Sequence, residues 1–177
     1  MLTDNEIKSF IKLGKIKIDP FEEELVETAN YRVRLGSKLL IPKENQRVIL
    51  NDSSSSPDYS EFDLEKENYV LKPKEFILGQ TYERIGLAKD VAAILDGRST
   101  LARLGVTIHQ SSQFIPSGQD YHVITLEIYN AGNFEIELVY KSKVGKLIFF
   151  KFDEPNASAY DDYGRYANQQ VTTGAIV

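Results

Sequence analysis

Short apolar segments separated by Gly, Pro or Asn recur roughly every ten to fifteen residues along most of this chain. In several of them apolar and polar side chains alternate, which is the period of a strand with one buried face. Many short strands with almost no helical segment predict a mainly β protein, built as a barrel, jelly roll or sandwich. The expected strands are residues 31–35, 38–42, 47–50, 69–71, 75–79, 91–95, 106–108, 122–129, 135–139 and 146–152.

One short amphipathic helix is expected at the start of the chain. Thr3 and Glu6 have the spacing of a capping box, in which each side chain pairs with the backbone N–H of the other residue. Ile7 and the apolar residues after it follow a helical period, and Gly14 is a typical residue just beyond a helix end.

The length of 177 residues suits one domain that spans residues 1–177. The net charge of −5 offers no broad positive surface, so we expect no nucleic-acid partner. No apolar run approaches the roughly 18 residues of a membrane span, and the opening MLTDNEIKSF lacks the pattern of a signal peptide. We therefore expect a cytoplasmic protein without membrane association.

The chain contains no cysteine. This excludes disulfides, thiolate nucleophiles, iron–sulfur clusters and the cysteine-bound zinc that common nucleobase deaminases use. His109 and His122 lie on separate expected strands without a third ligand at a regular spacing, so we interpret both as core or surface imidazoles. We predict no zinc and no metal site built from protein side chains.

Two polar stretches interrupt or end the strand pattern. Residues 51–61 are rich in serine and predict a mobile surface loop. Residues 156–177 contain too few apolar side chains to form a core and predict a flexible C-terminal tail. Within it, residues 163–170 offer aromatic rings, a guanidinium and amide donors, which suit either a lid that closes on a nucleotide or an ordinary disordered terminus.

The segment 96–105 predicts one or two helical turns, with Leu101 and Leu104 on its apolar side. Its polar side and start carry Arg98, Ser99, Thr100 and Arg103. Guanidinium groups, hydroxyls and free backbone N–H groups favour phosphate oxygens, so this segment is a candidate anion site. The alternative is a surface helix with Ser99 as its N-cap and its arginines paired with surface carboxylates.

Glu127 is the second candidate for chemistry. It lies on an expected strand whose apolar residues Ile124, Leu126 and Ile128 share one face, so the carboxylate is on the other face with Thr125. If that face borders solvent, the carboxylate only increases solubility. If that face borders a partly buried cleft, the carboxylate is a candidate general base.

Segments spread over almost the full length form a recognisable set. They read LTDNEI at 2–7 with GKIKIDPF at 14–21, VRLG at 33–36, FILGQTYE at 76–83, GRSTLARLG at 97–105, ITLEIYN at 124–130 and YANQQ at 166–170. With these segments in this order, the chain resembles the dCTP deaminase family, the metal-free branch of the dUTPase superfamily. The segment at 97–105 carries the strongest resemblance.

The resemblance implies a distorted jelly-roll or β-barrel fold of the dUTPase type. It also implies a homotrimer, or a hexamer, with active sites between subunits, and Mg²⁺ held mainly by the triphosphate of the nucleotide. The implied reaction is hydrolysis of dCTP to dUTP and ammonia, which supplies dUTP for dUMP and dTTP synthesis.

The resemblance also implies roles for individual residues. Glu127 would be the general base that takes a proton from the water attacking C4 and later passes protons to the leaving ammonia. Arg103 would keep that carboxylate ionised, and the Ser99 hydroxyl would position water or the tetrahedral intermediate. The implied nucleotide-binding residues are Arg98, Ser99, Thr100, Arg103, Thr125, Leu126, Glu127, Tyr160, Arg165 and Gln169, with Thr125 and Leu126 acting through their backbones.

The chain departs from the family pattern at residues 113–120, which read QFIPSGQD and are one residue longer. Family members carry an Asp there that meets the sugar 3′-hydroxyl and, in dUTPases, directs the hydrolytic water. Asp120 would have to reach back to replace that Asp. The absence of the family Asp counts against release of pyrophosphate. Phe114 and Arg32 also replace residues typical of the family.

Two other functions stay open from the sequence. One is a dUTP pyrophosphatase, or a bifunctional enzyme that converts dCTP to dUMP. The other is a non-catalytic nucleotide-binding paralogue that kept the fold.

Overall fold

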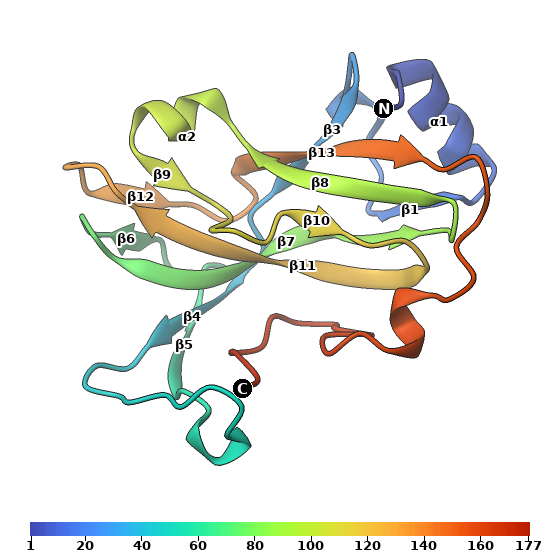
Figure 1. Cartoon of the computed structure of the whole chain (residues 1–177). Coiled ribbons are helices and arrows are strands. Elements are labelled where there is room, and N and C mark those ends of the chain that lie inside the picture. Colours follow the sequence, from blue (N-terminus) through green and yellow to red (C-terminus); the bar gives the residue numbers. More distant parts are fainter.

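Two antiparallel β-sheets form the body of the molecule, which a computed structural model describes over residues 1–177 (Figure 1). The first sheet has the order β5-β4-β7-β11-β9, and β1 also pairs with β7. The second has the order β10-β8-β13-β3-β2, while β6 and β12 form a separate two-stranded ribbon. The strands are β1 (Ile16–Asp19), β2 (Val26–Glu27), β3 (Asn30–Arg34), β4 (Lys38–Pro42), β5 (Tyr59–Asp63), β6 (Tyr69–Leu71), β7 (Phe76–Leu87), β8 (Val91–Gly97), β9 (Val106–Thr107), β10 (Phe114–Ile115), β11 (Gln119–Asn130), β12 (Ile136–Leu138) and β13 (Lys143–Lys151).

Helices are few and short, as the sequence predicts. They are α1 (Asp4–Lys12), α2 (Ser99–Arg103) and the 3₁₀ helices η1 (Glu23–Leu25), η2 (Ser53–Ser55) and η3 (Tyr160–Asp162). The capping box of α1 is confirmed, because the Glu6 N–H donates to Thr3 Oγ1 at 3.4 Å and the Thr3 N–H donates to Glu6 Oε2 at 3.0 Å. None of the helices has the length and apolar character needed to cross a bilayer.

The core lies between the two sheets and follows the alternation seen in the sequence. In β3, Tyr31 and Val33 are fully buried while their neighbours are partly exposed. Leu147 of β13 pairs with Tyr31 across the ladder, and Phe149 extends the same buried row. These side chains share one buried cluster with Ile77 and Leu126 of the first sheet, and each contributes about 2 kcal/mol by leaving water.

A buried ion pair joins the two sheets at one point. Arg34 of β3 lies with its Nε 2.6 Å from Oε1 of Glu83 on β7, and its backbone N–H donates to the other carboxylate oxygen at 2.9 Å. Burial raises the pKa of Glu83, and the bonds from Arg34 oppose that rise. Glu22 pairs with the same guanidinium at 2.8 Å, so Arg34 is shared between two carboxylates.

The strand predicted at residues 47–50, between β4 and β5, is absent. Residues 47–50 do not form a strand, and Val48, Ile49 and Leu50 are exposed. The reason is the register of the β4–β5 hairpin: Pro42 pairs with Tyr59, so residues 43–58 only close the hairpin and have no partner strand. For the same reason the expected loop 51–61 ends earlier, because Tyr59 begins β5.

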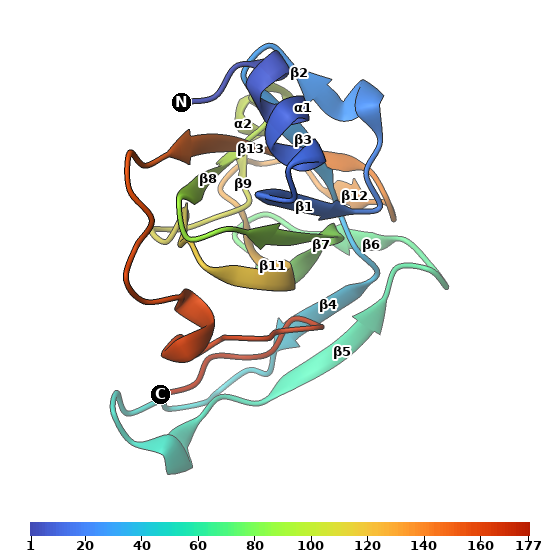
Figure 2. The ribbon, with the colours of Figure 1, turned by 90° about the vertical axis from the view of Figure 1, so that its right-hand side faces the viewer.

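The C-terminal tail, residues 156–177, leaves β13 and returns beside the first sheet (Figure 2). It passes through η3, runs next to β11 and ends near the β4–β5 hairpin. Backbone bonds hold it at Ser117, whose carbonyl accepts the Tyr160 N–H at 3.1 Å, and at Val123, whose N–H donates to the Gln169 carbonyl at 3.1 Å. The tail and β11 therefore form two sides of one space.

Candidate active site

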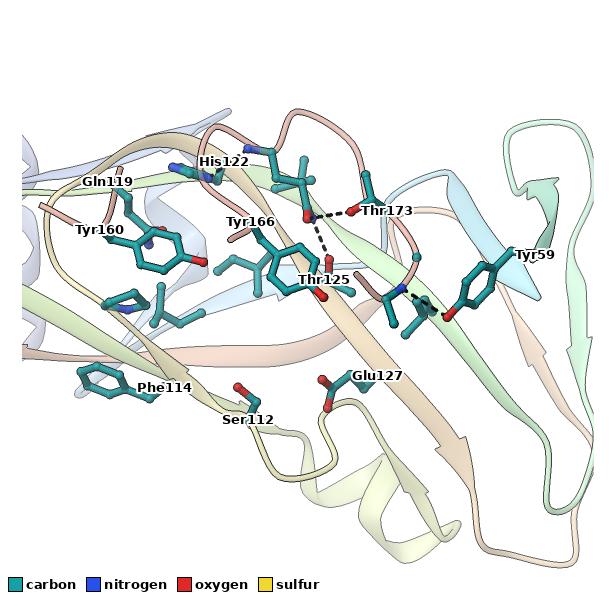
Figure 3. Close-up of a pocket in the computed structure, with 18 of the residues that line it drawn as sticks. Tyr59, Ser112, Phe114, Gln119, His122, Thr125, Glu127, Tyr160, Tyr166 and Thr173 are labelled. Carbon is teal, nitrogen blue, oxygen red and sulfur yellow. Dashed lines mark hydrogen bonds between the residues drawn. The ribbon is translucent and has the colours of Figure 1, made fainter. Parts of the chain in front are cut away.

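A cavity of about 370 Å³ lies between β11 and the tail (Figure 3). We call its two main sides the sheet wall and the tail wall. The sheet wall consists of residues 122–125 and Glu127 of β11 with Phe76 and Leu78 of β7, and the tail wall consists of Tyr160, Tyr166, Gln169 and residues 173–175. The segment 112–119 and Tyr59 close the remaining sides. Ten of its 19 lining residues are hydrophobic, which is typical of a small-molecule pocket with a few polar groups.

Two irregularities of the β7–β11 ladder shape the sheet wall. Between Gln119 and His122 three steps of β11 oppose two steps of β7, and a second shift lies between Val123 and Thr125. At this second shift the Ile124 N–H leaves the ladder and donates to Thr81 Oγ1 at 3.0 Å. Such bulges redirect side chains, and beyond them Thr125 and Glu127 face the cavity while Leu126 enters the core.

Glu127 faces the cavity with one carboxylate oxygen held and the other free. Its Oε2 accepts the backbone N–H of Gln110 at 2.7 Å, and its own N–H donates to the Ile108 carbonyl at 2.9 Å. Among all lining residues Glu127 is the single carboxylic acid. The predicted alternation around Glu127 is thus confirmed, and its face borders a cavity and not open solvent.

The tail wall meets the sheet wall through side-chain hydrogen bonds. Gln169 Nε2 donates to Thr125 Oγ1 at 2.7 Å, and the Thr125 and Thr172 hydroxyls lie 2.9 Å apart. Thr172 is almost fully buried, and its N–H donates to Gln80 Oε1 at 2.8 Å. Tyr160 and Tyr166 add two aromatic rings to the cavity (Figure 3).

The predicted anion-binding turn does form a short helix, α2, but within this chain none of its polar residues lines the cavity. The alternative with Ser99 as N-cap is wrong, since the N-cap is Arg98 and no side chain caps the helix. Its arginines are not paired with surface carboxylates either: Arg98 Nη1 donates to the Lys143 carbonyl at 2.7 Å, and Arg103 is exposed. Ser99 and Thr100 are exposed beside them.

Three further residues singled out in the sequence lie outside the cavity. Arg165 is exposed, and its Nη1 donates to the Ile176 carbonyl at 2.9 Å. Asp120 is exposed and pairs with Lys17 at 2.8 Å, a hydrogen bond that lowers the pKa of its carboxyl. Arg32 pairs with Glu27 at 2.7 Å within the second sheet.

The two histidines have different surroundings. His109 is partly buried, and its Nδ1 has no hydrogen-bonding partner. His122 is only 4% exposed, and both of its ring nitrogens are bonded to the tail. Nowhere do three or more His, Asp or Glu side chains gather as metal ligands.

Several residues that line the cavity have no recognisable signal in the sequence. Tyr59 reaches the cavity from β5, where its hydroxyl accepts the Ala175 N–H at 3.3 Å, and the sequence placed this residue in a loop. Ser112 lies opposite the tail wall on the side of Glu127 (Figure 3). Neither residue has a local motif, and Tyr59 is brought to the cavity by the pairing of β5 with β4.

This arrangement suits hydrolysis of a small, partly apolar ligand. A half-buried carboxylate with one fixed and one free oxygen can accept a proton from a water molecule on the cavity side. Amide and hydroxyl groups of Thr125 and Gln169 can orient a heterocycle, and the aromatic rings can cover it.

Comparisons with known proteins identify the family of this chain. A family model described as dCTP deaminase-like matches residues 1–152, which is the whole body without the tail. The chain therefore belongs to the dCTP deaminase-like family.

Individual relatives make the likeness more specific. The chain is 34% identical over 181 residues to a protein of Beutenbergia cavernae named "dCTP deaminase, dUMP-forming", a match that covers 99% of this chain and 93% of the relative. A Streptomyces avermitilis protein of the same name is also 34% identical, with 99% and 94% covered. Among solved structures, 2′-deoxycytidine 5′-triphosphate deaminase from Agrobacterium tumefaciens matches with a TM-score of 0.66 at 21% identity, over 85% of this chain and 47% of that one. This structural match supports the predicted fold.

Proposed function

We propose that this protein is a dCTP deaminase that hydrolyses the exocyclic C4–N4 bond of the cytosine amidine and releases dUTP and ammonia. The observation that carries the proposal is Glu127, the single acid on the cavity wall, with Oε1 free and Oε2 held by the Gln110 N–H. A water molecule beside Oε1 loses its proton to Glu127 as its oxygen attacks C4. Glu127 passes that proton to ring N3, then takes the proton of the new C4 hydroxyl and gives it to N4, so the C4–N4 bond breaks, ammonia leaves and a C4 carbonyl remains.

The second half of the site comes, in this proposal, from the α2 segment of a neighbouring copy in a homotrimer or a hexamer. Arg103 keeps Glu127 ionised and the Ser99 hydroxyl positions the water or the tetrahedral intermediate. Arg98 and Thr100 bind phosphate oxygens together with Ser99. The support is that α2 is exposed and that neither guanidinium has a carboxylate partner in its own chain.

The tail closes over the nucleotide. Thr125 and Leu126 border the sugar and the base through their backbones, and Gln169, Arg165 and Tyr160 complete the clamp around the nucleotide. Gln169 and Tyr160 already line the cavity, while Arg165 has to turn inward from its contact with Ile176.

Magnesium belongs to this proposal as a partner of the substrate. The chain offers no cluster of side chains that could hold the ion by themselves, which fits an ion carried by the triphosphate oxygens. When bound, Mg²⁺ supplies charge neutralisation at the phosphates. The deamination step itself uses only Glu127, Ser99 and Arg103.

A second candidate is the bifunctional reaction that continues to dUMP, which the names of the relatives favour. That reaction needs a second activated water, at the phosphates. Within this chain the cavity has no second acid for this water, because Asp120 is exposed and paired with Lys17, and none of the residues assigned to the neighbouring α2 is an acid. We therefore favour dUTP as the product.

One assay separates these outcomes. Purified protein is incubated with dCTP, or with dUTP, with and without Mg²⁺, and nucleotides and ammonia are followed by anion-exchange chromatography and an ammonia assay. Ammonia and dUTP in equal amounts support the deaminase, whereas dUMP and pyrophosphate establish the bifunctional enzyme. Tight binding of dCTP without turnover would establish a non-catalytic nucleotide-binding protein.

A further inference from the structure

His122 sits at the centre of the contact between the tail and β11. It is 4% exposed and lies between two separate parts of the tail, η3 on one side and Gln169 on the other. Its Nε2 is 2.9 Å from Asp161 Oδ1, and its Nδ1 accepts the backbone N–H of Gln169 at 3.3 Å. The ring of Tyr160 covers it at a centroid distance of 6.4 Å.

These two bonds fix the tautomer of the imidazole. Because Nδ1 accepts a hydrogen bond from the Gln169 N–H, the ring proton of neutral His122 is on Nε2, which donates a hydrogen bond to Asp161. Asp161 is itself held in place, since its Oδ2 accepts the Asp120 N–H at 2.8 Å. A buried ring with both nitrogens paired is thus a rigid link between two tail segments.

The link determines where the Gln169 side chain lies. The Gln169 N–H is held by His122 and the Gln169 carbonyl by the Val123 N–H at 3.1 Å, so its backbone is fixed on both sides. From this fixed backbone, Gln169 Nε2 reaches Thr125 Oγ1 at 2.7 Å on the sheet wall, two residues before Glu127.

We propose that His122 is a positioning residue of the nucleotide site, which holds the tail in the closed arrangement that places Gln169 over the cavity. This inference rests on the proposed function, because it assigns the role of His122 to the binding of the substrate of that reaction. His122 does not touch the reacting atoms. It acts through Asp161 and Gln169, so its loss weakens substrate binding more than the chemical step.

Two substitutions of His122 test the proposal. His122→Phe keeps a ring of similar size and removes both hydrogen bonds, whereas His122→Gln keeps one donor and one acceptor. Asp162→Asn is the matched control, because Asp162 neighbours Asp161 on η3 but bonds only the Ala159 N–H at 3.0 Å. Thermal unfolding of each variant shows that the body stays folded.

The first measurement is amide hydrogen exchange over residues 156–177 without nucleotide. We expect His122→Phe to reduce protection of the tail about tenfold and His122→Gln to retain part of this protection. The Asp162→Asn control should match the wild-type protein. The second measurement is KM and kcat for dCTP. We expect KM to rise about tenfold in His122→Phe with kcat within about threefold, and to recover in His122→Gln.

Clear results would overturn the proposal. Tail protection and KM in His122→Phe equal to those of the control would show that His122 does not hold the tail, and a fall in kcat at unchanged KM would exclude a role in substrate binding. If His122→Phe does not fold, Asp161→Ala removes the same contact from the tail side and takes its place. If the original protein releases no ammonia, the proposed function is wrong, while the exchange measurement still decides whether His122 holds the tail.

Discussion

The two walls of the cavity are built in different ways. The sheet wall belongs to β11, whose ladder with β7 runs from Gln119 to Tyr129 and whose alternate residues enter the core. The tail wall is held by a few backbone hydrogen bonds and by the side chains of His122, Gln169 and Thr172. The difference places the acid on the rigid side and the covering groups on the side that can open, since regions with few buried apolar contacts open at low free-energy cost.

The largest expected effect is on chemistry at the sheet wall. Glu127→Gln keeps the shape of the side chain and removes its basicity, so we expect the rate of ammonia release from dCTP to fall about 10³-fold. Stability and dCTP binding should stay close to those of the original protein. Glu135→Gln, an exposed acid outside the cavity, is the control. Full activity of Glu127→Gln would show that another group is the base.

The neighbouring residue on the same strand tests the other face. Leu126 is fully buried in the core, so Leu126→Ala should lower the free energy of unfolding by about 3 kcal/mol. The measurement is urea unfolding followed by circular dichroism. Val70→Ala, at a side chain that is 44% exposed, should cost far less. An equal loss for both variants would contradict the assigned orientation of β11.

A substitution at Gly118 tests how closely the tail packs against the loop before β11. Gly118 has a φ of +70°, and a Cβ there would lie 2.6 Å from the Cα of Ala159 in the tail. Gly118→Ala should therefore cost about 2 kcal/mol and loosen the tail in hydrogen exchange. Gly14→Ala is a matched control, because Gly14 has a φ of +69° but nothing within 4 Å of its Cβ position. If both variants leave the tail equally protected, the close approach at Ala159 does not seat the tail.

The smallest expected effect concerns the exposed pair of Asp120 and Lys17. Asp120→Asn should cost less than about 1 kcal/mol, because solvent screens the pair. The hydrogen bond with Lys17 lowers the pKa of Asp120 in the folded state, so its stabilisation is present above the ordinary value of 3.8 and is lost as the pH falls through the lower folded value. Unfolding free energies of both proteins at neutral and acid pH measure this. A loss in Asp120→Asn that is larger at acid pH would contradict the assignment.

The features that the sequence predicted correctly depend on neighbours along the chain. The capping box of α1, the alternation of β3 and the orientation of Glu127 all follow from residues a few positions apart. Apolar alternation requires one buried face wherever the partner strand lies, so no knowledge of pairing was needed.

The features that could not be predicted from the sequence depend on residues far apart along the chain. Val48 and its apolar neighbours have the composition of a strand but no partner, whereas Tyr59 follows a polar stretch and pairs with Pro42. The tail contacts were missed for the same reason. His122 and Gln169 are 47 residues apart, and no local pattern shows that they meet.

The bulge between Gln119 and His122 has a consequence for how this site can vary. In a regular ladder, one added residue turns every later side chain to the opposite face, which would move Glu127 into the core. Here β11 already has one more residue than β7 across the bulge, so extra length ahead of it is taken up locally. The loop that begins the strand can therefore change its length, and with it the ligands it admits, while the acid keeps its orientation.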